Sequence, residues 1–188
     1  DKGMDHPYMP LSLLSISRYA VEDFNIKIID QRINENWKKD LLKELNSSPL
    51  CVGISSVTGE QIKNGIEISK FVKEHSKVPV VWGGTHSSLL PEQTLSNKYI
   101  DFVIIGEGEI TFYELLKSLN KNKGFKEIDG LWYKENGYIK KNDLRKLVDI
   151  NTLPTLPYHL VNVKDYIMRL YGRRRLILET SRGCSNRC

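Results

Sequence analysis

A repeated unit, in which a short apolar run ends in glycine and a helix-forming segment follows, constrains the fold of this chain most strongly. Residues 78–82 are almost entirely apolar and run into the Gly-Gly pair at 83–84, and residues 100–105 run into Gly106 in the same way. Strands that are apolar on both sides are typical of a parallel sheet covered by helices on both faces. The repeat predicts an α/β fold with a doubly wound (Rossmann- or flavodoxin-like), mostly parallel sheet and helices on both faces.

Hydrophobic periodicity extends this prediction along the chain. Residues 60–75 carry apolar side chains at close to a 3.6-residue period, which indicates an amphipathic helix packed on the sheet. An Asn-Gly pair at 136–137 lies between two strand-like runs and predicts a small β-hairpin. We expect helices over residues 11–21, 37–45, 60–75 and 111–119, and strands over residues 25–30, 50–55, 78–82 and 100–105.

The chain divides into three predicted segments. Residues 1–148 form the α/β domain, and residues 149–174 form a linker, because residues 151–158 are polar and spaced by prolines. Residues 175–188 begin a second domain with the strand-like apolar run 176–178, which leads to Cys184 and Cys188. A chain of 188 residues can bury one good-sized core and start another.

Composition excludes several classes of protein. The net charge is +5, but the lysines are mixed with glutamates on predicted helices, so we expect solvated faces and no nucleic-acid partner. No apolar run approaches the ~20 residues of a membrane span. Nothing near residue 1 resembles a signal peptide, and three cysteines are too few for a disulfide scaffold, so a cytoplasmic location is expected. One local basic cluster, which we read as a solvated surface or as a lining for anionic groups near the cysteines, comprises Arg169, Arg173, Arg174, Arg175, Arg182 and Arg187.

The two C-terminal cysteines suit a soft metal centre, because thiolates are the ligands that iron–sulfur clusters and zinc select. Cys184 and Cys188 have the spacing Cys-x-x-x-Cys, which differs from the Cys-x-x-Cys of zinc ribbons and thioredoxin-like sites. Ordinary loop thiols, or a disulfide in a secreted protein, are the alternatives. Cys51 lies in an apolar run and is expected to be a buried small hydrophobic residue.

Three polar, glycine-containing turns follow the predicted strands and form the candidate ligand site. Ligands of doubly wound sheets bind outside the carboxyl ends of the strands, where glycine allows a bulky ligand to approach the backbone. Neither a dinucleotide fingerprint nor a P-loop is present. The alternative is that each turn only provides tight strand-to-helix geometry, with His86 a cap or surface residue and the two glutamates favoured by a helix dipole. The candidate residues are Ser55, Ser56, Val57, Thr58 and Gly59; Gly83, Gly84, Thr85 and His86; and Gly106, Glu107, Gly108 and Glu109.

The chain resembles the B12-dependent radical S-adenosylmethionine (SAM) family in three motifs and in their order. The motifs are VWGGTH at 81–86, DFVIIGEGE at 101–109 and, after the linker, Thr-Ser-Arg-Gly-Cys at 180–184. The resemblance covers nearly the whole chain. It implies that residues 1–148 are a cobalamin-binding-like domain, with cobalamin on the carboxyl edge of the sheet near the three turns. It also implies that residues 175–188 begin a truncated radical SAM barrel.

The same resemblance implies that Cys184 and Cys188 are two of the three ligands of a [4Fe–4S] cluster. In such enzymes the cluster binds SAM and cleaves it to a 5′-deoxyadenosyl radical, and the cobalt relays a methyl group. The implied function is that of a methyltransferase acting on a small-molecule substrate, with an electron donor such as flavodoxin or ferredoxin as partner. Alone, the chain is expected to be inactive, because two cysteines cannot complete a three-cysteine site.

The chain departs from the family pattern at two places. Cobalamin domains with a lower axial histidine carry Asp-x-His-x-x-Gly, whereas Asp30 is followed by Gln-Arg-Ile-Asn, so no histidine ligand is expected from that position. The family usually opens with a strand before a Pro-containing loop, whereas residues 1–10 are already loop-like. We therefore expect a fragment of a longer polypeptide.

Two other functions remain open at the level of sequence. The α/β domain of a radical SAM protein can bind substrate or a partner in place of cobalamin. The chain can also be a non-enzymatic module that binds or senses a small molecule.

Overall fold

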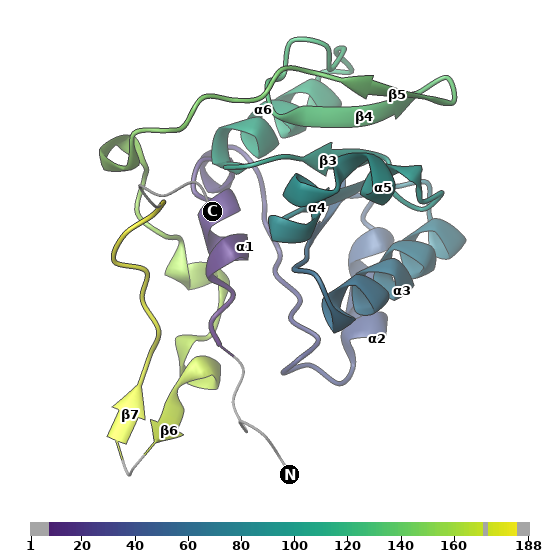
Figure 1. Ribbon diagram of the computed structural model, residues 1–188. Coiled ribbons are helices and arrows are strands. Elements are labelled where there is room, and N and C mark those ends of the chain that lie inside the picture. The colour runs from purple at the N-terminus through teal and green to yellow at the C-terminus, as the bar shows by residue number, and fades with distance from the viewer. Residues whose placement is uncertain (1–7, 171–172, 184–188) are drawn as a thin grey trace.

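The computed structural model describes residues 8–170 and 173–183 (Figure 1). Its centre is a five-stranded sheet of order β1-β2-β3-β4-β5. The first three strands are parallel, and β4 and β5 extend the sheet in antiparallel fashion. The strands are β1 (Val52–Ser55), β2 (Val80–Gly83), β3 (Phe102–Ile104), β4 (Leu131–Glu135) and β5 (Tyr138–Lys141).

Helices cover both faces of this sheet, as the side chains of β2 and β3 demonstrate. Val81 and Ile104 belong to a core cluster with Phe112 of α6, whereas Trp82 and Val103 belong to a second cluster with residues of α2, α3 and α5. Successive strand residues therefore face opposite helical layers, which explains why these strands are apolar throughout. Figure 1 shows α6 on one side of the sheet and α3 on the other. The α-helices are α1 (Leu11–Ile16), α2 (Trp37–Leu45), α3 (Glu60–His75), α4 (Thr85–Leu89), α5 (Pro91–Ser96) and α6 (Glu109–Asn120).

The α/β prediction is confirmed, and the bounds of α2 and α3 match the residues expected from periodicity. The predicted helix over residues 11–21 is shorter than expected, since α1 ends at Ile16 and a 3₁₀ turn, η1 (Ala20–Glu22), follows. The short helices α4 and α5 were not predicted, because each is too brief to display a helical period. The predicted hairpin is not separate, since β4 pairs with β3 and enlarges the main sheet.

The strand predicted over residues 25–30 is wrong. The structure assigns these residues no secondary structure, and they belong to neither sheet that it describes. A strand needs a neighbour that accepts and donates its backbone hydrogen bonds. Here, side-chain packing holds the segment instead, because Ile26, Ile28 and Ile29 contact three different core clusters.

Beyond the sheet, the predicted linker contains 3₁₀ turns, η2 (Ile150–Thr152), η3 (Tyr158–Leu160) and η4 (Val163–Tyr166), and a hairpin of β6 (Met168–Leu170) with β7 (Arg173–Arg175). The strand expected at residues 176–178 is wrong, since the structure assigns no strand there and pairs β7, three residues earlier, with β6. After β7 the chain runs back alongside α1 (Figure 1). In the described residues, no helix is long and apolar enough to cross a membrane.

Candidate functional site at the carboxyl edge of the parallel strands

The first glycine-containing turn, residues 55–59, leads from β1 into α3. Ser56 is buried, and its amide donates to the carbonyl of Gly83 at 3.0 Å, so the first and second turns are tied together. Val57, Thr58 and Gly59 are exposed. This turn therefore offers one hydroxyl, one apolar side chain and a bare backbone to a ligand, while Ser56 serves the protein's own packing.

The second turn, residues 83–86, leads from β2 into α4. A Cβ atom on Gly84 would lie 2.7 Å from the carbonyl oxygen of Ser56, so only glycine fits where the two turns touch. His86 is buried, which contradicts a surface role, and its Nδ1 lies 3.2 Å from the hydroxyl oxygen of Thr58. Its amide donates to the carbonyl of Ser56 at 3.2 Å. Only Thr85 in this turn is exposed.

The third turn, residues 106–109, leads from β3 into α6. Gly106 is exposed, and its amide donates to Ser88 Oγ at 2.9 Å. The carboxylate of Glu107 accepts from the amide of Val148 at 3.0 Å. Glu109 is the first residue of α6, as expected of a carboxylate favoured by the helix dipole, but it is only 3% exposed. Its charge therefore needs a partner.

Helix α1 supplies part of that partner and bridges the outer turns. Ser12 Oγ lies 3.1 Å from Ser55 Oγ, and Ser15 Oγ donates to Glu109 Oε1 at 2.6 Å. These serines are three residues apart, so they lie on one face of the helix. The part that α1 plays in the site was not predicted, although two serines at that spacing in an apolar helix were a signal.

Arg182 completes the environment of Glu109. Its Nη1 lies 2.7 Å from Glu109 Oε1, and its Nη2 donates to Ser15 Oγ at 2.9 Å. Burial alone would raise the pKa of the Glu109 carboxyl, but hydrogen bonds from Ser15, from its own backbone N–H and from Arg182 outweigh burial and hold that pKa below its usual value. Arg182 of the predicted basic cluster thus neutralises a carboxylate of the protein.

The charged side chains of the three turns are consequently engaged, and the exposed part of the edge is neutral. It consists of Val57, Thr58, Gly59, Thr85 and Gly106. Hydroxyls, backbone amides and one apolar side chain suit a bulky ligand that is held by hydrogen bonds and van der Waals contact. The buried candidates support the edge through contacts inside the protein; they are Ser56, Gly83, His86 and Glu109.

The predicted metal ligands Cys184 and Cys188 lie outside the described residues. Among the residues that are described, no group of three or more His, Cys, Asp or Glu side chains could hold a metal ion. The described chain reaches Gly183, and Arg182 places this end of it beside the third turn.

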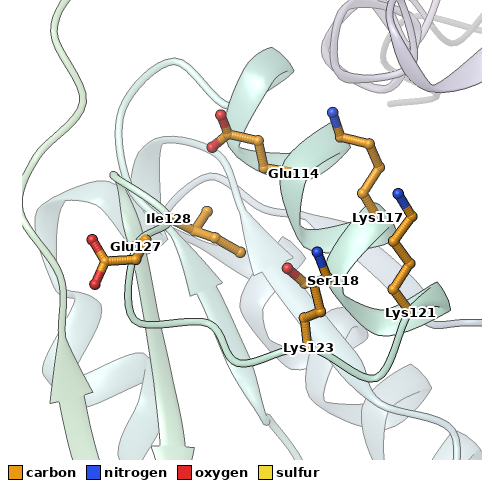
Figure 2. Close-up of a pocket in the computed structure, with 7 residues that line it drawn as sticks. All are labelled: Glu114, Lys117, Ser118, Lys121, Lys123, Glu127 and Ile128. Carbon is orange, nitrogen blue, oxygen red and sulfur yellow. The ribbon is translucent and has the colours of Figure 1, made fainter.

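Two hollows lie away from this edge. One, of about 320 Å³, lies beside α6, where Figure 2 shows Lys117 and Lys121 on one side and the carboxylates of Glu114 and Glu127 on the other. Its mixed charges fit a solvated surface. The other, of about 180 Å³, lies between residues 28–34 and 160–166.

Asp30 lines the second hollow and is held by the Arg32 guanidinium and the Tyr166 hydroxyl. Arg32 donates to both of its carboxylate oxygens, from Nε at 2.9 Å and from Nη2 at 2.6 Å, and the Tyr166 hydroxyl donates to Oδ2 at 3.2 Å. Burial opposes ionisation, but the bonds from Arg32 and Tyr166 hold the pKa of Asp30 below its ordinary value. This cluster attaches the predicted linker to the α/β domain.

A family model described as the B12 binding domain matches residues 4–116, which include all three turns. The chain belongs to the B12-binding domain family. Its match covers more than half of the 188 residues.

Relatives of this B12-binding domain include an uncharacterized methyltransferase of Pyrococcus horikoshii, 33% identical over 95% of this chain and 39% of the relative. The solved structure of the apo form of the cobalamin-dependent SAM radical enzyme OxsB is 27% identical, with a TM-score of 0.72 over 95% of this chain and 25% of that one. OxsB with aqua-cobalamin and SAM bound is 26% identical, with a TM-score of 0.64 over 76% of this chain and 20% of that one. The chain thus spans about two fifths or less of these proteins.

Proposed function

We propose that this chain is the cobalamin-binding part of a radical SAM methyltransferase. The position of Arg182 carries the proposal, because it brings the residue two before Cys184 to the third glycine turn, 2.7 Å from Glu109. The described residues directly before the predicted cluster loop therefore lie at the edge where we propose the corrin site. The Pyrococcus methyltransferase and OxsB, each of which matches 95% of this chain, support the assignment.

The exposed edge fits cobalamin by its chemistry. Thr58 and Thr85 would supply hydroxyls to the periphery of the corrin, and Gly59 and Gly106 would allow its flat face to approach the backbone. When bound, cobalamin supplies a cobalt that carries a methyl group, and a [4Fe–4S] cluster on Cys184, Cys188 and a further cysteine supplies the electron that cleaves SAM. This chain's own residues hold the neutral edge open and keep Glu107 and Glu109 from presenting charge to it.

Corrin binding tests the proposal directly. Protein expressed from the complete gene is purified anaerobically after growth with hydroxocobalamin, and corrin, iron and sulfide are measured together. We expect all three to be present. A cluster without corrin would instead favour a radical SAM protein whose α/β domain binds substrate or a partner, and the absence of both would favour a binding or sensing module.

A substitution at the edge tests the site itself. Thr85→Trp puts a large ring where the corrin is expected and should weaken corrin binding by about tenfold or more, the equivalent of ~1.4 kcal/mol. Gln93→Trp is the matched control, because Gln93 is also exposed but belongs to α5, which precedes the amino end of β3. Equal corrin affinity in the two variants would exclude the edge as the site.

A further inference from the structure

Arg182, Glu109 and Ser15 form a closed set of contacts between three distant parts of the chain. Arg182 Nη1 lies 2.7 Å from Glu109 Oε1, Arg182 Nη2 donates to Ser15 Oγ at 2.9 Å, and Ser15 Oγ donates to Glu109 Oε1 at 2.6 Å. Glu179 Oε1 adds a longer contact, 3.9 Å from Arg182 Nε. The carboxylate of Glu109 thus pairs with the guanidinium of Arg182, and the Ser15 hydroxyl accepts from the guanidinium and donates to the carboxylate.

Burial distinguishes this cluster from a surface ion pair. The Glu109 side chain is 4% exposed and that of Arg182 is 20% exposed. Exposed ion pairs contribute little, whereas removal of one partner from a buried pair leaves an uncompensated charge and is costly. Arg173, Arg174 and Arg175, in the same predicted basic cluster, are all exposed. Arg182 therefore stabilises the position of its segment in a way that its neighbours do not.

The segment that carries Arg182, residues 176–183, contains no regular secondary structure. The structure assigns neither helix nor strand to residues 176–183, and all of them except Arg182 are exposed. Ser15 belongs to α1, whose Ser12 also meets Ser55 of the first turn. A single side chain thus connects the C-terminal segment to a helix that contacts both outer turns of the edge.

We propose that Arg182, Glu109 and Ser15 are a positioning latch that fixes residues 179–183, and with them the start of the cysteine loop, against the third glycine turn. The catalytic meaning of the latch rests on the proposed function, because it would set the approach of the cluster to the corrin. The latch itself is a property of the described residues.

Limited proteolysis tests the latch without any cofactor. Thermolysin cleaves before Leu and Ile, and Leu176, Ile177 and Leu178 lie directly before the latched residues 179–183 and are untouched by the substitutions. Cleavage of a transiently released segment follows the population of the released form. Arg182→Gln and Glu109→Gln should each accelerate cleavage there by about tenfold, the expected effect of losing a hydrogen bond to a charged group.

Three comparisons control this experiment. Arg174→Gln removes an exposed arginine of the same predicted basic cluster, from β7, and should leave the rate unchanged. Arg182→Lys should retain much of the protection. The double variant Arg182→Gln/Glu109→Gln should accelerate cleavage by less than the product of the two single effects, because no unpaired charge remains. Circular dichroism verifies that each variant is folded. Rates for Arg182→Gln equal to those for Arg174→Gln would overturn the latch.

A spectroscopic measurement tests the positioning role in the loaded protein. In protein supplied with hydroxocobalamin and reconstituted with iron and sulfide, the magnetic coupling between cobalt(II) and the reduced cluster depends steeply on their separation. Arg182→Gln should weaken or abolish that coupling, although its corrin, iron and sulfide contents stay unchanged. Arg182→Lys should retain the coupling. Unchanged coupling in Arg182→Gln would refute positioning. Should wild-type protein retain no corrin, the proposed function fails, and the thermolysin rates still decide the latch.

Discussion

The indole N–H of Trp82 donates a hydrogen bond to Ser69, with 2.9 Å between Nε1 and Oγ. Trp82 lies on β2 and is 1% exposed, and Ser69 lies on α3 and is fully buried. The Ser69 hydroxyl in turn donates to the carbonyl of Gly65 at 2.8 Å. These two hydrogen bonds hold α3, which follows the first turn, against β2, which precedes the second turn. They therefore help to fix the relative positions of the two turns.

Ser69→Ala should lower the free energy of unfolding by about 1–3 kcal/mol, because the buried indole N–H would lose its acceptor. Urea denaturation of wild type and variant gives the difference. Ser96→Ala is the control, since the Ser96 hydroxyl bonds to Gln93 in an exposed position, and it should change stability by less than about 0.5 kcal/mol. Equal stability of the two variants would show that the Trp82 bond contributes nothing.

Gly65→Ala should also destabilise the protein. A Cβ atom there would lie 2.8 Å from two ring carbons of Trp82, and overpacking of this kind costs about 1–3 kcal/mol. Alanine's better helix propensity recovers only about 1 kcal/mol. Asn64→Ala, at the exposed neighbouring position of α3, should be neutral or stabilising. A more stable Gly65→Ala protein in the same urea assay would mean that α3 can move away from the sheet.

The Asp30 cluster should make stability depend on pH in acid. Because the folded protein lowers the pKa of Asp30 from 3.8, the ionised form contributes stability that is present above that value and is lost as pH falls through the folded pKa. Asp30→Asn should therefore be less stable than wild type near pH 7, with a difference that shrinks below about pH 3.8. Urea titrations at several pH values measure this, with exposed Asp129→Asn as the control. A constant difference would rule out ionisation as the cause.

Cys51 should be unreactive in the folded protein. Burial raises the pKa of its thiol to about 12, so almost no thiolate is present at pH 8. Mass spectrometry after iodoacetamide treatment should find Cys51 unmodified under native conditions and alkylated in 6 M guanidinium. Rapid native modification would contradict the expectation, drawn from its apolar neighbours in the sequence, that Cys51 acts as a small hydrophobic residue.

The fold was predictable where burial of one or both faces of an element produces a regular spacing of apolar residues in the sequence. The matches at α2 and α3, and the strands β2 and β3 with apolar residues on both faces, follow from that rule. The strand predicted at residues 25–30 failed because an apolar extended run does not reveal whether a neighbour is available for pairing. The same limit explains why the strand near the C-terminus is Arg173–Arg175 and not the apolar run that follows it.

The gathering of the three glycine turns at one edge was predictable, but which of their side chains are exposed was not. Glycine turns after parallel strands must gather at one edge of a sheet, and residues 55–59, 83–86 and 106–109 do so. Their sequences do not distinguish exposed Thr58 and Thr85 from buried Ser56 and His86. That distinction arises from contacts between turns, such as the close approach of Gly84 to Ser56.

By itself, the sequence determined the alternating strands and helices, the polar turns and the paired cysteines, because each of these is a local pattern of residue types. Only the tertiary structure decided that Ser15 and Arg182, 167 positions apart, meet at one buried carboxylate. Charge pairing acts through space, and the route of the chain between such residues is set by the packing of the whole domain. No local pattern of residues indicates which distant side chains will meet, so the contacts of Glu109 with Ser15 and Arg182 became apparent only in the tertiary structure.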